Sequence, residues 1–235
     1  MGEHGEHRAL VRALALLATL WAGAAGAAEC RLALLLALDV SSSVDAEEHA
    51  LQREGLAAAL AAPEIRRAIL GEAPGHVVLA VYEWSGRNQQ DVVLPWTVLD
   101  GDAAIDRAAA ALRGAPRAFS RFPTAVGYAL GFGVGMFRRG PDCARRVLDV
   151  SGDGIGNDGF EPVHAYRHFD FSGVTVNGLA VGGHDPQVRD YYMFELRRGP
   201  GAFVEYAEGY ADFRRAMERK LLREIRGMVI GRAGD

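Results

Sequence analysis

Two periodicities of apolar residues alternate along the chain, which predicts strands alternating with helices. Residues 32–38 form a continuous apolar run, as is typical of a central parallel strand that is buried on both faces. From Val44 the pattern becomes helical, with Asp45, Glu47 and Glu48 in the first turn, where the helix dipole favours negative charge. The chain is therefore expected to open its fold with a buried strand followed by a helix.

The same alternation continues to the end of the chain. Residues 76–84 and 91–98 are predicted strands, and the short turn between them indicates an antiparallel hairpin. The other predicted strands are 147–150, 173–181 and 202–206, and the other predicted helices are 102–112, 124–138, 162–169, 186–198 and 211–228. This pattern predicts an α/β fold with a mostly parallel sheet covered on both faces, in which ligands bind at the carboxyl ends of the strands.

Composition narrows the class of protein. The chain has 235 residues, of which 49% are hydrophobic, and 26 basic residues against 30 acidic ones give a formal net charge of -4. A chain of this composition can bury a core and is not intrinsically disordered. It also lacks the basic excess that sequence-independent nucleic-acid binding needs, so nucleic acid is not an expected partner.

The N-terminal segment predicts export. Arg8 and Arg12 precede an uncharged run over residues 13–28 that is too short and too rich in alanine and glycine for a spanning helix, and that ends in small residues suited to cleavage after Ala27 or Ala28. We expect a signal peptide over residues 1–28, one domain over residues 29–235, no stable membrane span after cleavage, and a periplasmic or secreted protein.

Export gives the two cysteines a possible role, because disulfides persist in oxidising compartments. Cys30 opens the first predicted strand and Cys143 stands just before the strand at 147–150. If these strands are parallel neighbours, both cysteines lie at the same end of the sheet. A Cys30–Cys143 disulfide is the favoured hypothesis, and two unpaired thiols are the alternative.

Five side chains at predicted strand ends and helix starts carry the chemistry. Asp39, Ser41 and Ser43 alternate in the loop after the first strand, Thr124 begins a helix, and Asp153 follows the strand at 147–150. Oxygen ligands of this kind suit Mg²⁺, with Mn²⁺ or Ca²⁺ as alternatives. Two carboxylates only neutralise a divalent ion, so a bound ion would still accept a carboxylate from outside, as in adhesion. The other interpretation of the loop is that Ser43 caps a helix.

These segments together resemble the metal-ion-dependent adhesion site (MIDAS) of von Willebrand factor A domains, over about residues 30–230. Residues 150–159, 174–183 and 199–203 are similar to an exported bacterial subfamily of this fold whose function is not established. The resemblance implies a three-layer, doubly wound, Rossmann-like domain with a six-stranded sheet of order 3-2-1-4-5-6 and strand 3 antiparallel. It implies direct metal binding by Ser41 and Ser43, and direct or water-mediated binding by Asp39, Thr124 and Asp153. It also places the first and fourth strands side by side, in favour of the disulfide.

Other residues leave alternatives open. Asn157 and Asp158 would either support the metal ligands from a second shell or cap the following helix. The Gly-x-Gly-x-x-Gly match at 154–159 is not expected to bind a dinucleotide, since Asp153 and Asp158 would repel its pyrophosphate. His164 and His168 are four residues apart, as in some zinc sites, but a solvated helix face is the plainer interpretation.

Two further segments receive structural interpretations. Tyr191, Tyr192 and Phe194 are expected to be mostly core residues. The basic stretch 214–226, interrupted by Glu218 and Glu224, is expected to be the solvated face of a helix.

The function expected from the sequence is that of an exported, monomeric binding domain. Its metal ion would coordinate an Asp or Glu of a partner protein. The alternative is a metal-dependent enzyme or small-ligand binder that uses the same cleft. No general base with an obvious partner is apparent beside the metal loop, so an enzyme is not expected.

Overall fold

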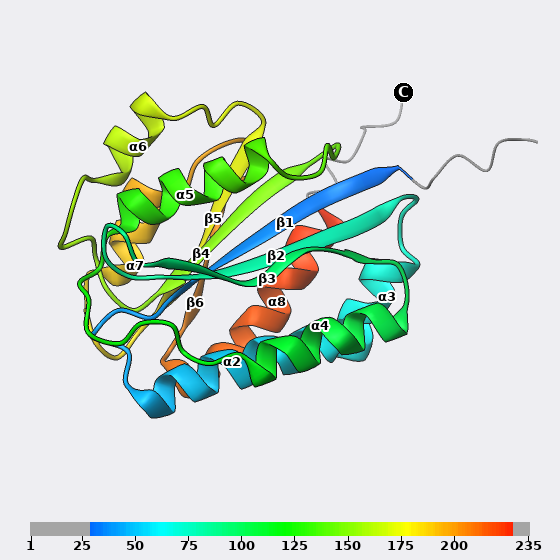
Figure 1. Cartoon of the computed structure of the whole chain (residues 1–235), viewed down its shortest axis with the longest axis horizontal. Helices are drawn as coiled ribbons and strands as arrows, with labels where there is room; N and C mark the ends of the chain where they lie inside the picture. Colours follow the sequence, from blue (N-terminus) through cyan, green and yellow to red (C-terminus); the bar gives the residue numbers. More distant parts are fainter. Residues whose placement is uncertain (1–28, 228–235) are drawn as a thin grey trace, which may run out of the picture.

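The computed structural model describes residues 29–227, which form one sheet with helices on both faces (Figure 1). The strand order is β3-β2-β1-β4-β5-β6, and all pairs are parallel except β2 with β3. The expected fold class, strand order and antiparallel hairpin are therefore confirmed. The strands are β1 (Cys30–Asp39), β2 (His76–Trp84), β3 (Gln90–Leu99), β4 (Arg146–Gly152), β5 (Val174–Val181) and β6 (Val204–Ala207).

Helices cover the sheet in two groups, one on each face, with a separate apolar cluster under each group. One group is α2 (Ala46–Ala61), α3 (Pro63–Leu70), α4 (Asp102–Gly114) and α8 (Phe213–Arg226), with the 3-10 turn η2 (Tyr210–Asp212) before α8. The other group is α5 (Val126–Arg138), α6 (Pro162–His168), α7 (Val188–Tyr191) and the π-helix η1 (Tyr192–Leu196). Because both faces are covered, β1 and β2 are almost wholly buried, which explains their continuous apolar runs.

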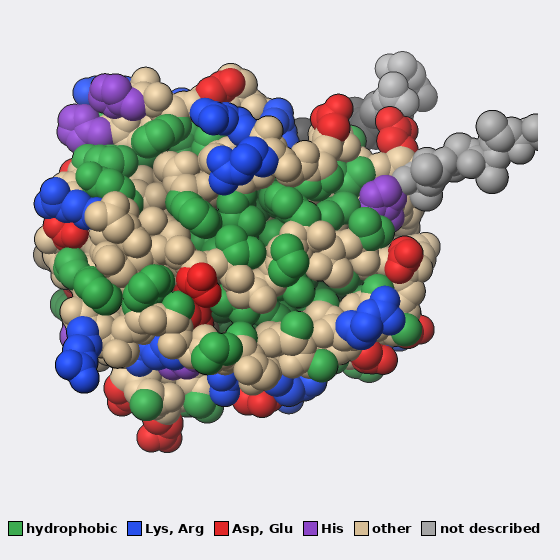
Figure 2. All heavy atoms as spheres, in the orientation of Figure 1, with side chains coloured by type: hydrophobic (Ala, Val, Ile, Leu, Met, Phe, Trp, Pro, Cys, Tyr) green, Lys and Arg blue, Asp and Glu red, His purple; other side chains and the backbone are tan. Residues whose placement is uncertain are grey.

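The edge strand β3 is more exposed than β1 and β2. Val92 and Val98 are 41% and 43% exposed, and hydrophobic side chains gather over β3 across the middle of the face in Figure 2. Pro95 lies within this strand, and proline is tolerated at an edge because its missing N–H breaks no interior ladder.

Helix α2 begins at Ala46 with Asp45 as its N-cap. Asp45 Oδ1 accepts hydrogen bonds of 2.8 Å from the N–H groups of Glu47 and Glu48, and Glu48 Oε2 accepts one from Asp45 N–H. This capping box satisfies the first turn of the helix. The alternative in which Ser43 caps the helix is therefore wrong, and the Ser43 hydroxyl is available for another role.

Helix α3 has no counterpart in the sequence prediction. It is only eight residues long, starts with Pro63 in the first turn, and buries Ile65, Ala68 and Ile69. With only three buried positions, the amphipathic pattern of α3 was too short to be recognised in the sequence. Proline in the first turn, before Glu64, is nevertheless a typical signal for the start of a helix.

The helix predicted over residues 186–198 is shorter and changes to π-helical winding at Tyr192. Val188, Tyr192 and Leu196 are buried at a spacing of four, whereas Phe194 is 74% exposed. Residues two apart on a helix point to nearly opposite sides, so burial of Tyr192 turns Phe194 towards solvent. The core assignment of Phe194 is wrong.

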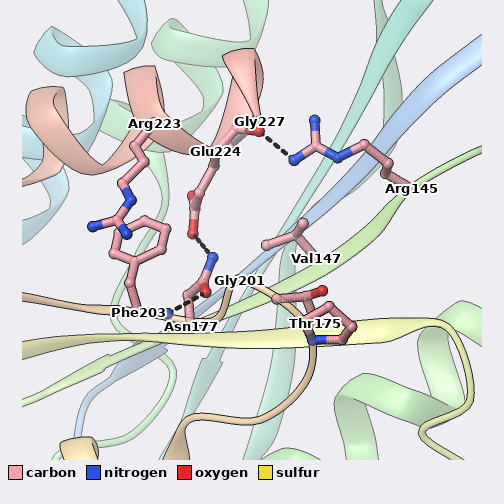
Figure 3. A pocket seen from close by; sticks show the side chains of 10 residues that line it. Arg145, Val147, Thr175, Asn177, Gly201, Phe203, Arg223, Glu224 and Gly227 are labelled. Carbon is pink, nitrogen blue, oxygen red and sulfur yellow. Dashed lines mark hydrogen bonds between the residues drawn. The ribbon is translucent and has the colours of Figure 1, made fainter. Parts of the chain in front are cut away.

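The stretch 214–226 is not uniformly solvated, because Lys220 and Glu224 of α8 are buried against the sheet. Lys220 Nζ lies 2.9 Å from Asp149 Oδ1 and 2.6 Å from Glu224 Oε1. Asn177 donates to Glu224 Oε1 and accepts from Phe203 N–H, as Figure 3 shows. Burial, with the negative charge of Glu224, raises the pKa of Asp149. Because Lys220 and Glu224 are four residues apart, both lie on the inner face of α8. Their ion pair offsets the cost of burying two charges.

A disulfide joins Cys30 to Cys143, with their Cα atoms 4.6 Å apart and a sequence separation of 113. It lies at the amino edge of β1 and β4, where Ala144 N–H also donates to the Cys30 carbonyl at 3.0 Å. The proposed pairing is confirmed.

The expected signal peptide over residues 1–28 lies outside the described residues, as does the predicted end of the last helix at Met228. Between residues 29 and 227, no helix has the length and apolar character required to cross a membrane.

Removal of the disulfide by Cys30→Ser with Cys143→Ser is expected to lower the free energy of unfolding by about 4 kcal/mol, since it releases a loop of more than a hundred residues in the unfolded chain. Urea unfolding with and without dithiothreitol measures this. Wild type should lose stability on reduction and the double serine variant should not respond; equal stability of oxidised and reduced wild type would contradict the prediction.

Candidate metal centre

The candidate site lies at the carboxyl edge of the sheet, on the left in Figure 1. Asp39 is the last residue of β1, and Asp153 directly follows β4. Because β1 and β4 are parallel neighbours with Leu38 opposite Ser151, the two aspartates leave the sheet side by side. Asp39, Ser41, Asp153 and Thr124 are at most 3% exposed, and Ser43 is half-buried.

Hydrogen bonds connect four of the five predicted ligands. Ser41 N–H donates to Asp39 Oδ1 at 2.7 Å, the hydroxyls of Ser41 and Ser43 lie 3.0 Å apart, and Ser43 Oγ donates to Asp153 Oδ1 at 2.7 Å. The loop after β1 therefore gathers side-chain oxygens from two strand ends at one place.

Each aspartate keeps one oxygen without a partner. Asp39 Oδ2 and Asp153 Oδ2 are buried and accept no hydrogen bond from the described residues. Burial, followed by the negative charge of Asp153, raises the pKa of Asp39 to about 7. Two buried, mutually repelling carboxylates with free oxygens are the environment that a divalent cation would stabilise, so these residues fit the expected ion.

Gly152 leaves room for this arrangement. A Cβ atom there would lie 2.7 Å from Asp39 Oδ2 and 2.6 Å from the Tyr192 hydroxyl. The sequence did not predict that Tyr192 approaches the site, because its contact depends on how η1 packs over β4 and β5.

Thr124 lies across the site, held by the loop after β4. A Cβ atom on Gly154 would be 3.8 Å from Thr124 Oγ1. Asn157 Oδ1 accepts from Thr124 N–H at 2.9 Å, and Asn157 N–H donates to the Thr124 carbonyl at 2.9 Å. Asn157 thus positions the segment that carries Thr124.

The side chain of Asp158 pairs with Arg87, whose Nε and Nη2 lie 2.9 and 2.8 Å from Asp158 Oδ1. This pair lowers the pKa of Asp158. The N-cap of α6 is Glu161, so neither Asn157 nor Asp158 caps that helix.

Arg117 is a residue that the sequence analysis missed. Its guanidinium group donates to five main-chain carbonyls, four of them in the loop between β1 and α2. The acceptors are Val40 at 3.1 Å, Ser41 at 3.1 Å, Val44 at 2.7 Å, Asp45 at 3.3 Å and, within its own loop, Phe119 at 2.6 Å. Arg117 therefore clamps the loop that carries Ser41 and Ser43, and no local motif marks a residue with this role.

Buried polar residues beneath the site complete the support. Gln52 of α2 donates to the Asp39 carbonyl at 3.2 Å. Glu83 of β2 lies 2.8 Å from His49 Nε2 and accepts from Ala118 N–H at 2.9 Å, which fixes the segment next to Arg117. These contacts join residues far apart in sequence, so periodicity could not indicate them.

A pocket of about 220 Å³ opens beside the site. Its lining includes Ser43, Thr124 and Asn157, together with His184 and Asp185 from the loop after β5. The sequence analysis did not select His184 and Asp185. Ligands in such folds bind at the carboxyl ends of parallel strands, and these two residues closely follow β5, so that rule could have identified them as pocket residues. The pocket makes the candidate site accessible to a ligand from solvent.

His164 and His168 lie exposed on α6, with their ring centroids 6.5 Å apart and His168 Nδ1 2.8 Å from the His164 carbonyl. Within residues 29–227, no group of three or more His, Cys, Asp or Glu side chains gathers to hold a metal ion. The candidate centre has two carboxylates, and its other oxygens are hydroxyls.

Solved structures share the fold at low sequence identity. Proximal thread matrix protein 1 from the mussel byssus is 12% identical with a TM-score of 0.61 over 84% of this chain and 49% of that chain. A von Willebrand factor type A protein from Catenulispora acidiphila is 16% identical with a TM-score of 0.58, over 83% and 43%. The pilus adhesin SpaC from Lactobacillus rhamnosus GG is 14% identical with a TM-score of 0.60, over 85% and 32%. The chain thus spans about half or less of these structures.

A second structure of the mussel protein has a zinc-occupied MIDAS motif; it is 14% identical with a TM-score of 0.58, over 84% of this chain and 49% of that chain. No curated protein matches the sequence. The model of one family, "Protein of unknown function (DUF1194)", matches residues 29–229. The chain therefore belongs to the DUF1194 family of unknown function and has a von Willebrand factor A-like fold.

Proposed function

We propose that this chain is an exported protein-binding domain that uses a divalent cation to engage an Asp or Glu residue of a partner protein. The observation that carries the proposal is the pair of buried aspartates, each with one unpaired oxygen, beside an open pocket. Asp39, Ser41, Ser43, Thr124 and Asp153 would hold the ion.

Charge explains why the proposed ligand is an acidic residue. Two carboxylates balance a divalent ion, and the three hydroxyls add no charge, so the bound ion would attract a further carboxylate. The pocket over Ser43 and Thr124 offers that carboxylate access. Mg²⁺ is the ion that we favour, with Mn²⁺ and Ca²⁺ as alternatives, and zinc at the MIDAS motif of the mussel protein supports divalent-metal use on this fold.

The disulfide supports export, because such bonds persist in oxidising compartments. Adhesion as the broad function is supported by the fold shared with a pilus adhesin. We propose a periplasmic or secreted protein that acts as a monomer.

A metal-dependent enzyme is the competing proposal, since His184 lines the pocket and imidazole is a common general base. Within the described residues no hydrogen bond or ion pair orients the His184 ring, and we therefore favour binding without catalysis.

Mg²⁺ or Mn²⁺ is expected to raise the melting temperature of wild type, because the ion binds only the folded arrangement of Asp39 and Asp153. The increase should vanish in Asp39→Ala and Asp153→Ala, whereas Asp142→Ala, which removes an exposed carboxylate near the other edge of the sheet, should respond as wild type does. Differential scanning fluorimetry with and without chelator measures this. An equal response in all four proteins would refute the metal assignment.

Metal affinity is expected to fall below pH 7. The pKa of Asp39, raised to about 7 in the metal-free fold, means that a proton must leave before the ion binds at lower pH. Because the pKa of Asp39 is raised from 3.8 to about 7, the metal-free fold loses stability as the pH rises from about 4 to 7, where the unfolded chain has already released this proton. A bound ion would remove this cost.

Titration calorimetry from pH 5.5 to 8 should show the affinity for Mn²⁺ dropping roughly tenfold per pH unit below 7. Asp39→Asn, which cannot titrate, should lose this dependence. A wild-type affinity that does not change between pH 5.5 and 8 would contradict the role of Asp39.

Replacement of Arg117 should weaken metal binding without touching a ligand. Arg117→Gln and Arg117→Lys both lose the planar group that spans the loop carbonyls, so the loop should loosen and the Kd for Mn²⁺ should rise about tenfold. Arg121→Gln, in an exposed arginine of the same segment, is the control. Folded Arg117 variants with wild-type metal affinity would show that the clamp has no part in binding.

A further inference from the structure

Two adjoining pockets lie at the amino ends of β4 and β5, on the edge of the sheet opposite the candidate metal centre. Their volumes are about 200 and 260 Å³, and both are lined by Arg145, Val147, Thr175 and Pro200. Arg223 lines the first and Arg146 and Arg198 line the second, and Figure 3 shows the first with Arg145 and Arg223 on either side of Glu224. We call the two together the arginine pocket, defined by Arg145, Arg146, Arg198 and Arg223.

Within residues 29–227, no ion pair neutralises the positive charges of this pocket. Among the described residues, none of its four arginines forms an ion pair with Asp or Glu, although seven other arginines do. Glu224 is the carboxylate in the lining, and its Oε1 already accepts from Lys220 and Asn177. The pocket is therefore cationic in a chain whose net charge is -4.

Contacts hold the guanidinium groups in place while leaving donors free. Arg223 stacks over the Phe203 ring at 3.8 Å and Arg198 lies over the Tyr166 ring at 4.7 Å. Stacking uses the face of a guanidinium group and leaves its N–H edge available. Arg145 and Arg146 each donate from Nη2 to one main-chain carbonyl, of Glu224 at 2.7 Å and Ser172 at 3.1 Å.

Arg145 is also costly to keep charged at this edge. Burial lowers the pKa of Arg145. Burial, followed by the positive charge of Arg145, lowers the pKa of neighbouring Arg31, which donates to the carbonyls of Ala68, Ile69 and Ile225. A bound anion would relieve this repulsion.

The wall of the pocket is a fixed turn. Gly199 has φ 96°, and a Cβ atom there would lie 3.2 Å from Thr175 Cα. Glycine thus lets the segment 199–201 pass close over β5, and the pocket is formed without movement of this turn.

We propose that the arginine pocket binds a small anion that carries at least two carboxylate or phosphate groups. Planar guanidinium groups bind both chemistries through paired N–H donors. Two small hollows around Arg145 suit separate anionic groups of one molecule, and the net negative charge of the chain disfavours an extended polyanion.

Citrate and pyrophosphate are the probes, used in titration calorimetry on the full chain after chelator treatment, at constant ionic strength. Wild type should bind at least one of them, and a preference for citrate or pyrophosphate identifies the carboxylate or phosphate class. Arg145→Gln with Arg223→Gln should raise the Kd at least about tenfold. Arg198→Gln alone should also weaken binding, and it provides the test if the double variant does not fold.

Arg214→Gln is the matched control. Arg214 lies on α8, as Arg223 does, but it is exposed and pairs with Glu218. The control variant should bind as wild type does, and so should Asp39→Ala, which separates this pocket from the candidate metal centre. Absence of binding by wild type, unchanged affinity in the folded pocket variants, or an equal loss in Arg214→Gln would overturn the proposal.

Discussion

The parallel pairing of β1 with β4 is the constraint on which the rest of the structure depends. Its register sets Leu38 opposite Ser151, so that Asp39 and Asp153 emerge together at one edge of the sheet. At the other edge the same pairing brings Cys30 within reach of Cys143. A shift of one residue between these strands would turn every side chain of one strand to the wrong face and would separate both pairs.

Burying two carboxylates next to each other is unfavourable, and the surrounding chain is organised around that cost. Ser41 N–H donates to Asp39, and the hydroxyls of Ser41 and Ser43 continue this link to Asp153. The positive Arg117 draws the loop carbonyls together nearby. Lys220 and Glu224 of α8 form a second buried charged group with Asp149 of β4, but there the cation is a side chain of the protein. The contrast indicates why the first group fits an external cation and the second does not need one.

The sequence predicted the elements whose signal is local and repeated. The continuous apolar run of β1, the hairpin of β2 with β3 and the strand-end positions of Asp39 and Asp153 could all be located in this way, while the strand order came from the family resemblance. Contacts set by three-dimensional packing could not be predicted. Arg117 reaches the loop between β1 and α2 from more than seventy residues away. Lys220 has the sequence context of a basic residue on a surface helix, and only the sheet beneath it shows that it is buried.

The disulfide edge also determines how the domain can be attached to other structures. The main-chain carbonyl of Glu29 accepts a hydrogen bond from His76 N–H beside the start of β1. Arg145 lies close to Gly227 at the end of α8. The first and last described residues therefore both lie at the edge that carries the disulfide. The pocket beside Ser43 and Thr124 opens at the opposite edge. A support joined at residue 29 or residue 227 would thus hold the domain with the pocket beside Ser43 and Thr124 facing away from the support.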